Sequence, residues 1–262
     1  MTVQYVLVYP IHNITLPVGK KAYFASDFHL CTLHSAVGKS REEKIVQWMK
    51  EIKSTCGVLF LVGDIFDFWH EYKYAVPKGH IRLLGVLADF RDSDIPVIIF
   101  TGNHDIWMYD YFEQELQLTI YRRPQVFILD NKKFFVAHGD GLGPGDKKFK
   151  FLKKIFTAPF FQWCFRWLHP DIGIKIAALW SEKSRTDPAM EQYMGDDREF
   201  LLQYARRKLQ EQPCDYYIFG HRHLPLDIAL SPNARYFNLG DWIVNHTYLE
   251  YDHENCYLKK YL

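Results

Sequence analysis

The feature that most constrains this chain is a set of five short apolar runs, each of which stops at acidic, amide or imidazole side chains. Runs of this length, rich in β-branched and aromatic residues, are typical of buried strands. Polar groups that follow several strands of one sheet point to a site along a single edge of that sheet. The runs occupy residues 22–26, 57–63, 96–102, 133–137 and 215–219.

Strand and helix patterns alternate in the first half of the chain. The segments 40–53 and 79–92 have helical length, and the first carries an apolar stripe at helical spacing. Such alternation indicates parallel strands covered by helices. Residues 125–139 resemble a hairpin, and the closely spaced runs over 215–262 predict antiparallel strands. The sum predicts a mixed α/β fold, with two mixed sheets packed face to face and helices outside.

A proline-punctuated segment interrupts the strand pattern. Its pieces between prolines have helical length, and a further helix is predicted over 196–211. We therefore expect a catalytic core formed by 1–141 and 213–262, with a helical cap at 142–212 that contributes to substrate binding.

Composition excludes some classes of protein. A net charge near +1 gives no bulk field for nucleic acid, and we expect no nucleic-acid partner. Five cysteines without a C-x-x-C spacing argue against a disulfide framework and a cysteine zinc site. Neither a signal peptide nor an apolar run of spanning length is evident. A cytoplasmic protein is the simplest expectation, and attachment to a membrane surface remains open.

Nine polar residues follow the five runs. In Asp-x-His and His-x-His, an extended backbone would place both side chains on the same side. One histidine at a strand end is more often satisfied within the protein than a ligand, but five such ends in order are hard to obtain by chance. The candidates are Asp27, His29, Asp64, Asn103, His104, Asp105, His138, His221 and His223.

This mixture of side chains suits a pair of divalent metal ions. Carboxylates and imidazoles without cysteine fit Mn²⁺, with Fe²⁺ or Zn²⁺ as alternatives. About seven ligands are too many for one ion and suit two, with Asp64 as the bridging carboxylate. Two ions roughly 3.5–4 Å apart can align a phosphoryl group with an attacking water, which indicates phosphoester hydrolysis.

The ordered motifs SDFHL, GDIFDFW, GNHD, AHGD and GHRH resemble the calcineurin-like metallophosphoesterase superfamily. The resemblance implies a four-layer αββα sandwich of two mixed sheets. It also implies one ion held by Asp27, His29, Asp64 and His223, and a second held by Asp64, Asn103, His138 and His221.

Two residues of GNHD would act on the substrate by the same resemblance. His104 would stabilise the phosphoryl oxygens or protonate the leaving group. Asp105 would orient His104, although a turn or helix-cap carboxylate is an equal alternative for it.

GDIFDFW, HGDGLGPGDKKF and NLGDW narrow the resemblance to the UDP-2,3-diacylglucosamine hydrolase family. That family cleaves the pyrophosphate of a UDP-linked diacylated sugar in lipid A biosynthesis, usually with Mn²⁺, and releases UMP and 2,3-diacylglucosamine 1-phosphate. Its best-known branch has arginine after the ligand asparagine, where this chain has His104. This departure bears on the phosphoryl contact and leaves the metal ligands intact.

The predicted cap is rich in aromatic residues with lysines beside them. The simpler interpretation is that these aromatic residues pack on the core. The alternative is that the cap forms a surface that binds acyl chains and an anionic inner membrane. Expected substrate-binding residues are Asn103, His104, Asp146, Phe149, Ser181, Lys183, Arg185 and His221.

Two other functions and one residue stay open. A different metallophosphoesterase, acting on a phosphodiester or a nucleotide-linked substrate, would share the metals. A non-catalytic scaffold would have lost ligands, whereas every ligand position is filled here. Arg222, within GHRH, is expected to point away from the metals and has no functional account at this point.

Overall fold

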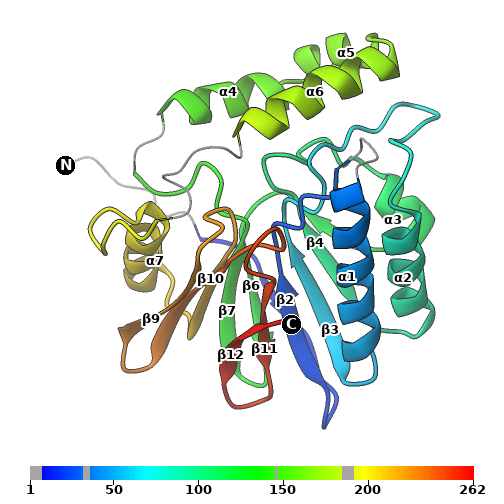
Figure 1. Cartoon of the computed structure of the whole chain (residues 1–262). Coiled ribbons are helices and arrows are strands. Elements are labelled where there is room, and N and C mark those ends of the chain that lie inside the picture. The colour runs from blue at the N-terminus through cyan, green and yellow to red at the C-terminus, as the bar shows by residue number, and fades with distance from the viewer. Residues whose placement is uncertain (1–7, 32–35, 145–146, 185–191) are drawn as a thin grey trace.

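The computed structural model describes residues 8–31, 36–144, 147–184 and 192–262. The side chains of 36–37, 147–149 and 178–184 are outside this description. Two six-stranded sheets lie face to face between helices, with three further helices across one end of the sheets (Figure 1). This arrangement confirms the predicted mixed α/β sandwich.

One sheet joins the N-terminal strand to strands from the second half, in the order β1-β6-β7-β8-β10-β9. Its strands are β1 (Ile11–Asn13), β6 (Gln125–Leu129), β7 (Lys132–Ala137), β8 (Tyr216–Phe219), β10 (Ala234–Leu239) and β9 (Pro225–Ser231).

The second sheet joins the first-half strands to the C-terminal hairpin, in the order β12-β11-β2-β3-β4-β5. Its strands are β12 (Cys256–Lys260), β11 (Thr247–Tyr251), β2 (Lys21–Ala25), β3 (Cys56–Val62), β4 (Val97–Phe100) and β5 (Thr119–Tyr121).

Seven helices are formed by the described residues. They are α1 (Ala36–Ile52), α2 (Ile81–Asp92), α3 (Tyr111–Leu116), α4 (Lys147–Thr157), α5 (Pro159–Arg166), α6 (Pro170–Ser184) and α7 (Phe200–Glu211).

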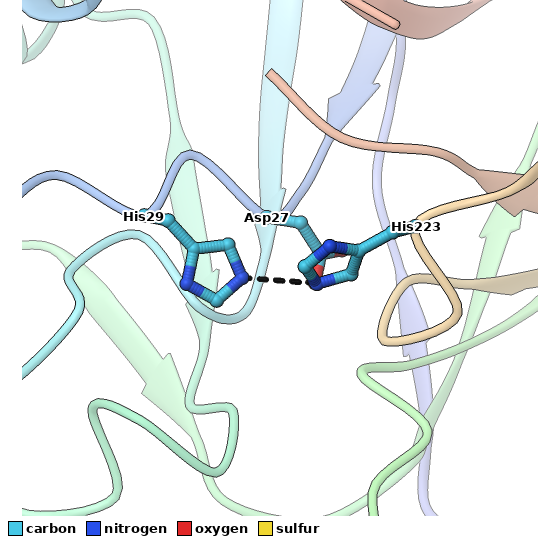
Figure 2. A group of neighbouring side chains, drawn as sticks. All are labelled: Asp27, His29 and His223. Carbon is cyan, nitrogen blue, oxygen red and sulfur yellow. Dashed lines mark hydrogen bonds and ion pairs between the residues drawn. The ribbon is translucent and has the colours of Figure 1, made fainter. Parts of the chain in front are cut away.

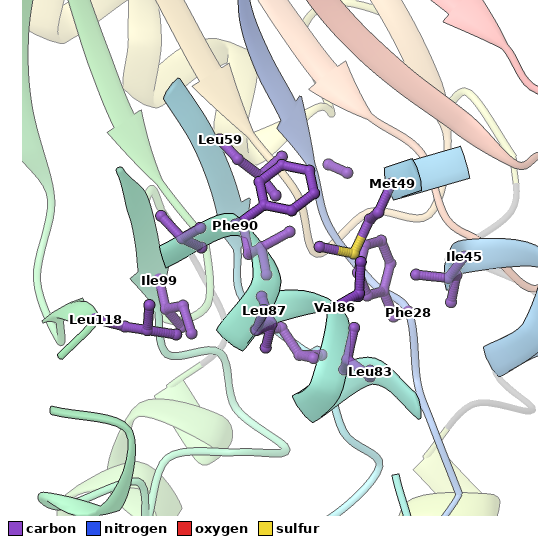
Figure 3. Close-up of a cluster of buried hydrophobic side chains, with 14 of the residues drawn as sticks. Phe28, Ile45, Met49, Leu59, Leu83, Val86, Leu87, Phe90, Ile99 and Leu118 are labelled. Atoms are coloured by element: carbon purple, nitrogen blue, oxygen red, sulfur yellow. The ribbon is translucent and has the colours of Figure 1, made fainter. Parts of the chain in front are cut away.

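Three buried clusters define the four layers. The helices α1 and α2 cover the second sheet through side chains such as Met49, Leu87 and Phe90 (Figure 3). Phenylalanines from both sheets fill the space between them, and Phe24 stacks on Phe60 at a ring distance of 4.5 Å. On the far side, α7 packs on the first sheet. The order helix, sheet, sheet, helix follows from one apolar face on each helix and two on each sheet.

The second half of the chain is less antiparallel than predicted. The hairpin of β6 and β7 forms, and β9–β10 and β11–β12 pair antiparallel. However, β8 lies parallel to both β7 and β10. The long excursion through α4–α7 brings β8 back in the direction of β7, as a crossover connection does. The strand-like pattern alone could not show this reversal.

The helix predicted over 196–211 begins later, at Phe200. Gly195, at φ 90°, and a turn over the residues after it precede the helix. The buried residues of α7 place it on the sheet, while α4–α6 lie across the ends of the strands (Figure 1). The division into a core and a cap at 142–212 stays a prediction.

The cap and the core meet through aromatic contacts. The Trp107 indole N–H donates to Phe156 O in α4 at 2.8 Å, and its ring lies 4.6 Å from that of Phe165 in α5. Lys153 of α4 pairs with Asp140 at 2.5 Å. None of the helices in the described part of the chain combines the length and apolar character needed to cross a bilayer.

Candidate metal centre

The candidate ligands lie on tight turns directly after the strands. Asp27, His29, Asp64, His221 and His223 all have left-handed backbone, with φ between 47° and 69°. The expectation that Asp-x-His and His-x-His share one side of an extended backbone is therefore wrong. The side chains still converge, since their candidate ligand atoms lie within 4.8 Å of one another in each group. Non-glycine residues adopt this region at a cost that the surroundings must offset.

Two glycines in these turns leave room for the candidate ligands. A Cβ on Gly102 would collide with Asp64 Oδ1, and one on Gly220 would stand 2.6 Å from Asp27 Oδ2. No side chain larger than hydrogen fits at either position without moving a carboxylate. The glycines of GNHD and GHRH are thus explained by close approach.

Asp27, His29 and His223 form the first group (Figure 2). The Nε2 atoms of the two histidines lie 3.0 Å apart. Asp27 Oδ1 is 3.2 Å from His223 Nε2 and 3.7 Å from His29 Nε2. These three side chains come from segments nearly 200 residues apart in sequence and present their polar atoms to one point.

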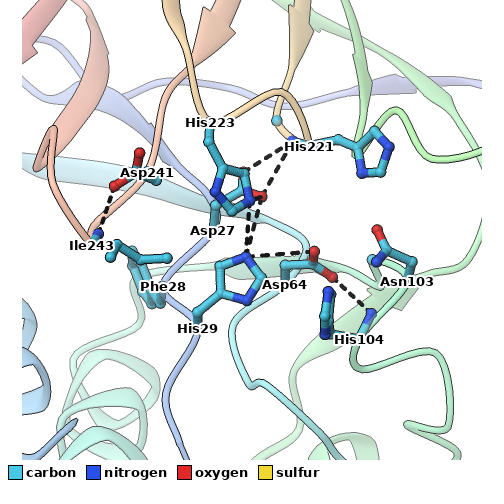
Figure 4. Close-up of polar contacts among 12 residues, drawn as sticks. Asp27, Phe28, His29, Asp64, Asn103, His104, His221, His223, Asp241 and Ile243 are labelled. Carbon is cyan, nitrogen blue, oxygen red and sulfur yellow. Dashed lines mark hydrogen bonds and ion pairs between the residues drawn. The ribbon is translucent and has the colours of Figure 1, made fainter. Parts of the chain in front are cut away.

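Asp64 connects the first group to a second one. Its Oδ2 lies 3.7 Å from His29 Nε2 and 3.3 Å from His138 Nε2. Candidate ligand atoms of Asp64, His138 and His221 all lie within 4.8 Å of one another. Asn103 contributes Oδ1 at 3.3 Å from His138 Nε2. The seven residues expected from the sequence are thus brought together. Asp64 lies between His29 and Asn103 in Figure 4.

Acceptors behind two histidines fix which nitrogen faces the cluster. His29 Nδ1 donates to the Asp67 carboxylate at 3.1 Å, and His138 Nδ1 donates to Val62 O at 2.9 Å. Because these partners accept the Nδ1 proton, Nε2 is the atom presented to the cluster. Such support is usual behind metal-ligating histidines. Asp67 stands three residues after Asp64 in GDIFD, and no sequence pattern indicated that it supports His29.

The buried carboxylates of the cluster favour a positive charge between them. Burial alone would lower the pKa of His138, yet the Asp64 carboxylate raises it to about 10. Burial opposes the same effect at His29, where Asp27 and Asp67 raise the pKa to about 9. Burial would raise the pKa of Asp27, but hydrogen bonds to His223 and His29 hold it far below its usual range. An oxygen- and nitrogen-rich cluster with this preference fits borderline divalent cations.

His104 and Asp105 play different parts in the turn after β4. The His104 ring lies 4.9 Å from that of His29, and its Nδ1 donates to Asp67 O at 3.1 Å. Asp105 accepts the backbone N–H groups of Gly102 and Ile65 at 2.7 and 2.8 Å. The two carboxylate oxygens of Asp105 therefore hold the backbone after β3 and after β4. The sequence had instead suggested a contact between Asp105 and the His104 ring. Burial, with Asp64 nearby, raises the Asp105 pKa to about 7.

The NLGDW motif and the turn that follows it support the GHRH segment. Asn238 Nδ2 donates to Gly220 O at 2.6 Å. Asp241 accepts the N–H groups of the turn that follows it, including that of Ile243 at 2.6 Å (Figure 4). Asn245 Nδ2 then donates to His223 O at 2.8 Å. The motif therefore holds the GHRH segment from behind.

The expected substrate contacts on the cap cannot be placed. Asp146 and Arg185 lie outside the described residues, and so do the side chains of Phe149, Ser181 and Lys183. Asn103, His104 and His221 are described and lie at the cluster.

The described part of the cap exposes an unusual amount of aromatic surface. No residue of α5 is buried. Trp163 is 57% exposed and Trp167 76%. Lys150, Lys153 and Lys154 of α4 add positive charge nearby.

The profile of the calcineurin-like phosphoesterase family matches residues 20–225. The chain is 32% identical to the UDP-2,3-diacylglucosamine hydrolase of Porphyromonas gingivalis, over 88% of this chain and 94% of that protein. It is 26% identical to the hydrolase of the same name from Histophilus somni, over 88% of this chain and 96% of the relative. The chain belongs to the calcineurin-like phosphoesterase family and, within it, to the family of the UDP-2,3-diacylglucosamine hydrolases.

Proposed function

We propose that this protein hydrolyses the pyrophosphate bond of UDP-2,3-diacylglucosamine to UMP and 2,3-diacylglucosamine 1-phosphate. The observation that carries the proposal is the pair of carboxylate–imidazole groups joined by Asp64 beneath an aromatic cap. The likeness to the P. gingivalis hydrolase, over 88% of this chain and 94% of that protein, supports the substrate.

The same seven residues would hold two divalent metal ions. Asp27, His29, Asp64 and His223 would bind one ion, and Asp64, Asn103, His138 and His221 the other. Mn²⁺ is the proposed native metal, since the donor set lacks cysteine and mixes carboxylate with imidazole. When bound, such ions supply Lewis-acid polarisation of phosphoryl oxygens and lower the pKa of water.

The protein itself would position the metal-binding side chains and the substrate relative to one another. The backbone N–H of His104 donates to Asp64 Oδ1 at 2.9 Å, which fixes the orientation of the shared carboxylate. His104 Nδ1 donates to Asp67 O, so Nε2 would be the ring atom that meets the phosphoryl group or the leaving oxygen. Asn103 and His221 would contact the substrate phosphates from the other side. His104 therefore takes the place that arginine fills in the best-known branch of the family.

The cap would bind the acyl chains and the surface of the inner membrane on the cytoplasmic side. Phe160, Phe161 and Trp163 expose between 46% and 65% of their area. Each buried methylene contributes about 0.8 kcal/mol, so acyl chains would supply much of the substrate affinity. Lys154 of α4, which has no ion pair among the described contacts, would favour anionic head groups.

The proposal is tested by product release. Purified protein with Mn²⁺ should release UMP from UDP-2,3-diacylglucosamine far faster than it cleaves bis(p-nitrophenyl) phosphate. Comparable rates on both substrates would favour a less specific phosphodiesterase. Absence of hydrolysis with either substrate would leave only a scaffold role.

A further inference from the structure

Arg222 lies between two candidate ligands, yet its side chain is directed away from them and is 1% exposed. Its Nε donates to Glu199 Oε2 and its Nη2 to Glu199 Oε1, both at 3.0 Å. Glu199 is fully buried as well. Two parallel charge-assisted hydrogen bonds are the most directional contact that an arginine makes with a carboxylate.

Glu199 is itself fixed at the start of α7. Its backbone N–H donates to Gly195 O at 3.1 Å, and its carboxylate also accepts the N–H of Met194 at 3.2 Å. Arg222 Nη2 donates further to Gln192 O at 3.0 Å. The guanidinium thus fastens the GHRH turn to residues 192–199, through which the chain returns from the cap helices to the core.

The GHRH turn is held by side chains on several sides. Asn238 binds Gly220 O before it and Asn245 binds His223 O after it. From the α7 side, the Arg222 guanidinium holds the centre of the turn through Glu199. His221 and His223 have φ of 69° and 52°, a conformation that persists when the surroundings impose it.

We propose that Arg222 is a positioning residue for the metal centre, which it serves by locking the His221–His223 turn onto Glu199. The inference rests on the proposed two-metal site and adds a residue to it. Through the same contact, residues at the end of the predicted cap bind the turn that carries His221 and His223. These two histidines belong to different proposed metal sites. Phe200 reinforces the connection, since its ring lies 5.9 Å from the guanidinium and 6.2 Å from the His221 ring.

A purely structural role for the pair predicts a different outcome. Removing one partner leaves an unpaired buried charge, which destabilises a protein strongly whatever its function. Replacing both partners by apolar residues of similar volume is often neutral or stabilising. The double replacement therefore separates positioning from stability.

The test compares Arg222→Met/Glu199→Leu with wild type as metal-free protein, and titrates each with Mn²⁺ alone by calorimetry. We expect a melting temperature close to that of wild type, an Mn²⁺ dissociation constant raised about 10–100-fold, and kcat lowered with little change in KM. Unchanged Mn²⁺ affinity in the folded double variant would overturn the inference.

A matched control lies at the other end of the same helix. Lys208 is 3% exposed and pairs with Glu211 at 2.6 Å, close to the C-terminus of α7. The Lys208→Met/Glu211→Leu variant should bind Mn²⁺ as wild type does. Weakened binding in this control, equal to that in the Arg222 variant, would overturn a specific role for Arg222.

Arg222→Lys keeps the inference testable if the double variant does not fold. Lysine keeps the charge and loses the planar fork, so Mn²⁺ affinity should fall severalfold in a folded protein. Wild-type affinity in Arg222→Lys would overturn the inference. Should the wild-type protein bind Mn²⁺ and cleave no UDP-linked sugar, the proposed substrate fails while these titrations still decide the role of Arg222.

Discussion

The metal centre and the cap solve different problems with different kinds of surface. At the centre, buried carboxylates and imidazoles are supported by further hydrogen bonds, as His29 is by Asp67 and His138 by Val62 O. On the cap, α5 has no buried residue and presents aromatic rings outward. Chemistry on a phosphoryl group depends on atoms held to a fraction of an ångström. Binding an apolar chain depends mainly on area. The comparison predicts large losses of turnover at the centre and losses of affinity at the cap.

The largest effect is expected from Asp64→Asn. Asp64 lies between both groups, so the variant should lower kcat by at least about 10³-fold, equal to about 4 kcal/mol of activation free energy. Steady-state UMP release measures this. Asp227→Asn, in an exposed pair with Arg235, serves as the control and should retain activity. Near-wild-type turnover in Asp64→Asn would refute a shared carboxylate.

Gly102→Ala should lower kcat by about 10²-fold, because the new methyl group displaces the Asp64 carboxylate. Gly85→Ala is the matched control, since a Cβ there meets no atom within 4 Å in the middle of α2. That control should gain about 0.4–1 kcal/mol of stability and keep full activity. Equal activity in the two variants would contradict the crowding argument.

Truncating Phe160, Phe161 and Trp163 to alanine should act on KM. Lost burial of only two methylenes amounts to about 1.6 kcal/mol, so KM for the diacylated substrate should rise at least about tenfold. The rate on a small aryl phosphodiester should not change. Tyr257→Ala, which removes a ring that is 44% exposed on β12, is the control. Equal losses on both substrates would leave α5 with a packing role only.

The smallest effect concerns the seam between the regions. Burial and Arg166 lower the pKa of His70 to about 4 from 6.5, and its ring lies 4.9 Å from Phe165 of the cap. Between these values the unfolded chain binds more protons, so stability falls as pH drops from about 6.5 to 4. Thermal melts at pH 7 and pH 5 measure the decrease in melting temperature between the two values. In His70→Phe this decrease should be smaller by a few degrees. His169→Phe, at a ring that is 68% exposed, should keep the wild-type decrease.

The sequence predicted which side chains converge better than it predicted the backbone that brings them together. The strand ends that carry Asp, His and Asn could be predicted directly, because their order along the chain does not depend on how the strands pair. The left-handed backbone at Asp27 and His223 could not be predicted, because neither aspartate nor histidine adopts that conformation in most positions.

Supporting contacts were harder still to predict. Asp67 behind His29, and Glu199 behind Arg222, are ordinary acidic residues until folding brings the pairs together across 38 and 23 positions. The parallel pairing of β8 likewise depends on where a 78-residue excursion between Ala137 and Tyr216 returns, which local patterns do not encode.

The central claim is that two divalent ions at the strand ends carry the hydrolysis. Its most direct measurement titrates metal-free protein with Mn²⁺ while bound metal and UMP release from UDP-2,3-diacylglucosamine are followed together. The account predicts that activity rises to a plateau at two Mn²⁺ per chain. Full activity at one ion per chain, or in the presence of a chelator without bound metal, would contradict it.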